Sequence, residues 1–161
     1  MTGAGRQAPA MPPHSTLKGR GNSSMKSLTV PAELEQLQTV QDFIAEELES
    51  RDCPMKAQFQ IEVAVEEIFV NIAHYAYRPE VGEATIRCDV TDAPLQVIIQ
   101  FLDHGKPFNP LDREDADTSD EALLEREGGL GILLVKKSMD HVQYTYENGR
   151  NILTIQKKLK E

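Results

Sequence analysis

The sequence predicts one α/β domain, a two-layer sandwich in which helices cover one face of an antiparallel-rich mixed sheet. Two observations predict this fold: helical and strand-like patterns alternate along residues 25–161, and short turns join neighbouring strand patterns. The composition agrees, because a chain of 161 residues that is 40% hydrophobic and 27% charged suits a single compact domain.

The first expected elements are one strand and two helices. Residues 26–30 alternate like a short strand, and Pro31 fits the first turn of a helix that runs to about Ser50. A second helix should run from about Pro54 to Tyr77, because a proline at position 79 disfavours helical geometry in the residue before it.

Four strands and one helix should complete the domain. The strand patterns at 84–90 and 95–103 are joined by the turn sequence TDAP, which predicts an antiparallel pair. Residues 131–140 have the length of a helix, and the final strands at 141–147 and 151–159 flank NGR, a strong hairpin signal.

Residues 1–24 are expected to be a flexible leader or an expression tag, which leaves 25–161 as the folded body. This segment is rich in Gly, Pro and Ser and has no aromatic residue, so it cannot bury a core. The segment carries three basic residues and no acidic one, so the body holds 14 basic and 26 acidic residues, a formal charge of −12. Such a charge repels nucleic acid and anionic membranes, so we expect neither and favour a small molecule or a protein as partner.

Cysteine and hydropathy patterns predict a cytoplasmic protein. No apolar run approaches the roughly 20 residues that span a bilayer. Cys53 and Cys88 lie far apart without metal-ligand spacing, which favours reduced thiols over a disulfide framework. The four histidines form no metal motif either.

Polar residues interrupt the apolar pattern of the second helix, IEVAVEEIFVNIAHYAY. Glu67 and Asn71 are four residues apart and can converge on one object, whereas Glu66 is rotated by about 140° from Asn71. The alternative is that Glu66 and Glu67 belong to an ordinary solvent-exposed edge of the helix and that Asn71 is a surface amide. The stripe that should face the sheet consists of Ile61, Val65, Ile68, Ile72 and either Tyr75 or Ala76.

Asp103 ends an apolar strand and precedes Gly105 by two residues in the sequence DHGKPFNP. Its carboxylate can therefore face a pocket, while the glycine allows the backbone to approach a flat ligand closely. The alternative is an Asx-turn that closes the strand.

A glycine-rich sequence, GGLGILLVKK, leads from Gly128 directly into the next predicted helix. Free N–H groups and the positive end of the helix dipole favour an anion at such a helix start. The alternative is that the glycines only form a hinge in the loop before the helix. Before it, residues 106–128 form a long acidic connection, which is typical of a lid, a binding loop or disorder.

Together and in this order, the three motifs make residues 28–159 resemble the GHKL superfamily of ATP-binding domains. Within it, the chain is most similar to the anti-sigma factor serine/threonine-protein kinase family. VEEIFVNIAHYAY resembles the N box, DHGKPFNP the first glycine box and GGLGILLV the second. The resemblance implies the Bergerat ATP-binding fold, with ATP and Mg²⁺ as cofactors.

The resemblance also implies roles for individual residues. Asn71 would supply an oxygen to Mg²⁺, and Glu67 would orient or deprotonate the attacking hydroxyl group. Asp103 would accept a hydrogen bond from the adenine amino group, and Gly105 would line the purine slot.

Further roles concern the phosphates and the last strand. Residues 106–128 would form the ATP lid, and Thr154 matches a polar position that touches the base region. The phosphates would lie against the start of the helix, at Gly128, Gly129, Leu130 and Gly131.

The implied function is a serine/threonine kinase of a partner-switching system. It would phosphorylate a STAS-domain anti-anti-sigma protein, bind a sigma factor in turn, and form a homodimer. The alternative is a non-catalytic ATP-binding module that sequesters a protein partner. Glu67 together with Asn71 favours the kinase, because a pure binder needs the magnesium ligand but not the base.

Overall fold

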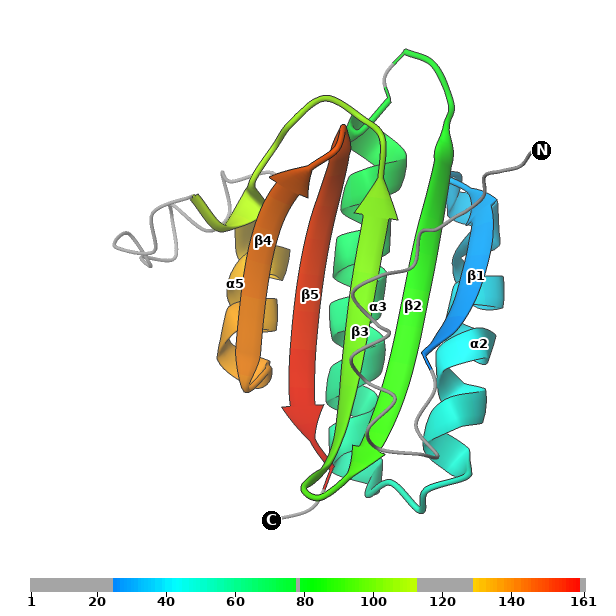
Figure 1. Ribbon diagram of the computed structural model, residues 1–161, viewed down its shortest axis with the longest axis vertical. Helices are drawn as coiled ribbons and strands as arrows, with labels where there is room; N and C mark the ends of the chain where they lie inside the picture. Colours follow the sequence, from blue (N-terminus) through cyan, green and yellow to red (C-terminus); the bar gives the residue numbers. More distant parts are fainter. Residues whose placement is uncertain (1–24, 78, 113–128, 160–161) are drawn as a thin grey trace, which may run out of the picture.

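The computed structural model describes residues 25–77, 79–112 and 129–159, and shows one sheet with helices on a single face (Figure 1). The predicted leader at 1–24 and the part of the predicted lid at 113–128, which includes Gly128, lie outside the described residues. The element order is β1 (Lys26–Pro31), η3 (Leu34–Gln36), α2 (Leu37–Glu49), α3 (Met55–Tyr75), β2 (Glu83–Asp92), β3 (Leu95–Asp103), η4 (Pro110–Asp112), α5 (Gly129–Ser138), β4 (His141–Glu147) and β5 (Arg150–Lys158).

The sheet has five strands in the order β1-β2-β3-β5-β4. The two-layer α/β sandwich is therefore confirmed. The expectation of a mixed sheet is wrong for the described strands, because each neighbouring pair runs antiparallel. The reason lies in the connections: short turns join β2 to β3 and β4 to β5, and β5 returns beside β3 in the opposite direction.

Element boundaries differ from the predicted ones by a few residues. The first helix does not begin at Pro31, because that residue still pairs with Glu83 in the sheet and a 3₁₀ turn precedes Leu37. Helix α3 ends at Tyr75, and α5 begins at Gly129, two residues before its predicted start. No helix in the described ranges is both long enough and apolar enough to cross a membrane.

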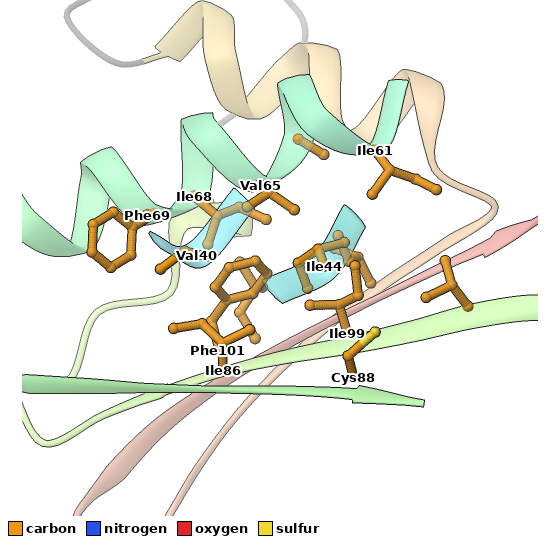
Figure 2. Close-up of a cluster of buried hydrophobic side chains, with 14 of the residues drawn as sticks. Val40, Ile44, Ile61, Val65, Ile68, Phe69, Ile86, Cys88, Ile99 and Phe101 are labelled. Atoms are coloured by element: carbon orange, nitrogen blue, oxygen red, sulfur yellow. The ribbon is translucent and has the colours of Figure 1, made fainter. Parts of the chain in front are cut away.

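The core lies between α2, α3 and the inner face of the sheet. Figure 2 shows side chains of α3 such as Val65 and Ile68 pointing toward Ile86 and Phe101 on the strands. The predicted stripe of α3 is buried, and Ala76 rather than Tyr75 extends it, because Tyr75 is 43% exposed.

Alternation along the strands decides which side chains lie under the helices. On β3 and β5 the odd-numbered residues face inward, among them Phe101 and Leu153, which are buried. Gln100 and Thr154 pair directly across these strands and point to the opposite, outer face. A polar residue at the end of either strand therefore reaches the helix side only if its number is odd.

Candidate functional site

A cavity of about 500 Å³ lies between α3, the inner face of the sheet and α5. Its volume is within the range usual for a small-molecule site. Its apolar walls include Ile68, Ile72, Phe101, Phe108, Ile132 and Leu153. Its polar lining residues are Asn71, Asp103, Lys106, Tyr144 and Asn151, and Tyr75 also lines it. A pocket of this kind suits a ligand with a flat apolar part and a few polar groups.

Asp103 places a buried carboxylate in the cavity near the end of α3, and the residue is 5% exposed. Oδ1 accepts hydrogen bonds from the Gly105 N–H group at 2.8 Å and from Asn151 Nδ2 at 2.9 Å. The bond to Gly105 is the Asx-turn that the sequence left as an alternative. Both bonds are made by Oδ1, so within the described part of the chain Oδ2 is the oxygen that a ligand can use.

Gly105 is buried beside the cavity but is not among the residues that line it. A Cβ atom at this position would lie 2.2 Å from the carbonyl oxygen of Ala76, and the next residue, Lys106, donates its N–H to that same oxygen at 3.3 Å. The close approach that requires glycine here is to the end of α3, and the next residue, Lys106, lines the cavity. That Gly105 also borders the purine slot stays a prediction.

We expect Gly105→Ala to lower the free energy of unfolding by about 1–3 kcal/mol, because a backbone atom must move to admit the methyl group. The segment resists that movement, since the His104 N–H group donates to the Tyr77 hydroxyl at 2.7 Å. Urea denaturation measures the change. His104→Ala is the matched control, as it removes only an exposed side chain, and equal stability of the two variants would contradict the packing argument.

Asn71 and Glu67 lie one turn apart on the face of α3 that meets α5. Asn71 lines the cavity, whereas Glu66 is exposed on the other side of the helix. A Cβ atom at Gly131 would lie 1.9 Å from Glu67 Oε1, so the carboxylate occupies space that only glycine leaves free. Burial, and then the charge of Glu66, raise the pKa of Glu67 above its usual range.

The start of α5 supplies backbone donors beside this carboxylate. Gly129, Leu130 and Gly131 are its first three residues, and the first N–H groups of a helix have no partner within it. Such N–H groups and the positive end of the helix dipole favour an anion at this position. The earlier start of α5 thus places three of the four predicted residues in its first turn, and the fourth, Gly128, lies outside the described residues.

Thr154 does not reach the cavity, and its predicted place near the base region is wrong. Its hydroxyl accepts a hydrogen bond from Gln100 Nε2 at 3.3 Å on the outer face of the sheet. The residues of β5 that line the cavity are Asn151 and Leu153. Asn151 was missed, although its odd number, shared with the apolar Leu153 and Ile155, indicates an inward side chain.

The two ends of the cavity differ in their chemistry. One end offers the Asp103 carboxylate between apolar walls, which suits a flat ring with a hydrogen-bond donor. The other end has Asn71, with Glu67 and the first turn of α5 nearby, which suits an anionic group. The described residues contain no cluster of three His, Cys, Asp or Glu side chains for a metal ion, so a cation here would share Asn71 with oxygens of the ligand.

Comparison with known proteins gives matches along most of the chain. Residues 30–157 match the family described as histidine kinase-like ATPase domain. Serine-protein kinase RsbW of Bacillus cereus is 28% identical over 95 residues, which cover 58% of this chain and 59% of that protein. RsbW of Listeria monocytogenes is 29% identical over 98 residues, covering 58% and 61%. The matched part is thus about 60% of the length of these curated relatives.

A solved structure shares the fold. It holds the RsbU and RsbW domains of a Mycobacterium tuberculosis protein, and it superposes with a TM-score of 0.62 at 14% sequence identity. The superposition covers 86% of this chain and 33% of that one.

Proposed function

Since the chain belongs to the histidine kinase-like ATPase domain family, we propose that it is a Mg-ATP-dependent serine/threonine-protein kinase that phosphorylates a STAS-domain anti-anti-sigma protein. The carrying observation is that Asp103 and Asn71 line one cavity, with Asp103 next to the segment that packs on Ala76 at the end of α3 and Asn71 five residues before Ala76. Glu67 does not line the cavity, but it lies one turn before Asn71 and against Gly131 at the start of α5. The RsbW relatives, which are named serine-protein kinases, support the same proposal. A sigma factor as second partner, a homodimer and a cytoplasmic location belong to this proposal.

Adenine is the ring that the Asp103 end suits best. Oδ2 would accept a hydrogen bond from the 6-amino group, while Ile72, Phe101 and Leu153 provide apolar walls for the purine. A hydrogen bond to a charged group contributes about 1.5–3 kcal/mol, enough to select among purines.

The phosphates belong at the other end of the cavity. Backbone N–H groups in the first turn of α5 would bind phosphate oxygens, because the first N–H groups of a helix have no partner within it. Asn71 fits Mg²⁺, because it is a hard oxygen ligand and this ion usually keeps water and phosphate oxygens as its other ligands. Bound Mg²⁺ would neutralise charge on the phosphates.

Glu67 is the residue that fits the chemical step. A serine hydroxyl is a poor nucleophile at neutral pH, and a carboxylate within reach of it accelerates transfer by about 10²–10⁴-fold as a general base. The hydroxyl oxygen forms its bond to the γ-phosphorus, the bond to the β,γ-bridging oxygen breaks, ADP leaves, and Glu67 holds the proton. The raised pKa makes Glu67 a stronger proton acceptor than an ordinary glutamate.

We expect a STAS-domain protein from the same organism to become labelled on serine or threonine with γ-labelled ATP and Mg²⁺, but not with GTP. Guanine has a carbonyl group where adenine has the amino group, so two acceptors would face each other at Asp103. Electrophoresis of the labelled protein measures phosphorylation with each nucleotide, and titration measures the affinity for ATP and for GTP.

Two outcomes would contradict the proposal in different ways. Equal use of ATP and GTP would remove Asp103 as the reader of the base. ATP binding without a phosphoprotein would favour the alternative, a non-catalytic module that sequesters its partner.

A further inference from the structure

We propose that Asn151 is a positioning residue that determines purine specificity, because it holds the Asp103 carboxylate and the adjoining cavity wall in one arrangement. This inference rests on the proposed function, in which Asp103 reads adenine. Asn151 lies at the start of β5, is 7% exposed, and lines the cavity beside Asp103.

The amide nitrogen of Asn151 connects the carboxylate to the segment that follows β3. Nδ2 donates to Asp103 Oδ1 at 2.9 Å, to the Lys106 carbonyl oxygen at 3.0 Å and to the Gly105 carbonyl oxygen at 3.3 Å. One side chain therefore contacts both the group that would read the base and the backbone of the wall beside it.

The amide oxygen of Asn151 is used as fully as the nitrogen. Oδ1 accepts from the Phe108 N–H group at 3.1 Å and from the Tyr144 hydroxyl. Acceptors surround Nδ2 and donors surround Oδ1, so this orientation of the amide is the one that satisfies every contact. Phe108, Lys106 and Tyr144 all line the cavity, which places Asn151 at the junction of three of its walls.

These contacts decide which oxygen of Asp103 a ligand meets. With Oδ1 bonded to both Asn151 and Gly105, rotation of the carboxylate is restricted and Oδ2 keeps one direction. Without Asn151, the carboxylate keeps only the turn bond to Gly105, and the Lys106 and Phe108 backbone groups lose their partner. The hydrogen bond from the adenine amino group to Asp103 Oδ2 then contributes less to binding, because the acceptor is no longer preorganised.

The test compares ATP with purine riboside triphosphate, which lacks only the 6-amino group. For the wild type we expect ATP to bind about tenfold or more tightly, the contribution of one hydrogen bond to a carboxylate. In Asn151→Ala this ratio should fall toward one, as it should in Asp103→Ala. Tyr144→Phe, which removes one of the two donors to Asn151, should lower the ratio by less. Gln156→Ala, on the outer face of the same strand, should keep it.

The ratio separates specificity from mere support of the fold. If Asn151→Ala weakens both nucleotides equally and the ratio stays at its wild-type value, the inference is overturned. Should Asn151→Ala not fold, an unchanged ratio in Tyr144→Phe overturns it as well. Wild-type protein that binds neither nucleotide would overturn the proposed function and this inference together, an outcome distinct from the other two.

Discussion

Replacing Glu67 by Gln should lower phosphotransfer from ATP by about 10²-fold or more and leave the affinity for ATP nearly unchanged. Glutamine keeps the size and reach of the side chain, including its place against Gly131, but it cannot accept the proton of the attacking hydroxyl. Single-turnover transfer to the partner protein measures the first quantity, and titration of ATP without the partner measures the second.

Glu66→Gln is the matched control, because it neutralises a neighbouring carboxylate on the exposed side of α3. Its phosphotransfer at neutral pH should equal that of the wild type. Activity should be lost as the pH falls through the raised pKa of Glu67, since protonation removes the base. Glu66 contributes to that rise in pKa, so in Glu66→Gln this acidic limb should move to lower pH. Equal loss of transfer in both variants would show that Glu67 is not the base.

Replacing Asn71 by Ala should weaken nucleotide binding by about tenfold or more when Mg²⁺ is present, and little when it is chelated. The reason is that alanine removes an oxygen ligand from the cavity but leaves the Asp103 end intact. Calorimetric titration of ATP with Mg²⁺ and with a chelator gives both affinities.

Asn71→Asp separates metal binding from packing at the same position. Aspartate keeps an oxygen of similar reach, so Mg²⁺-dependent binding should persist in this variant. An Asn71→Ala variant that weakens binding equally with and without Mg²⁺ would show that Asn71 contacts the nucleotide or supports the fold, and does not hold the ion.

Local sequence patterns were sufficient for most of the fold, for physical reasons that individual elements show. Residues 61–72 bury one stripe because apolar residues recur at the helical period, and the NGR turn joins β4 to β5 as its hairpin signal predicts. Boundaries were less predictable. Pro31 suits a helix start by its own geometry, but pairing with Glu83 keeps it in the sheet.

The sequence by itself determined the order of helices and strands, the inward stripe of α3, and the separation of Glu67 from Glu66, because these depend on periods of a few residues. Only the tertiary structure decided which distant groups meet. It placed Asn151 rather than Thr154 beside Asp103, Glu67 against Gly131, and Gly105 against the carbonyl of Ala76. Such contacts join residues tens of positions apart, and the packing of α3 and α5 on the strands sets their distances.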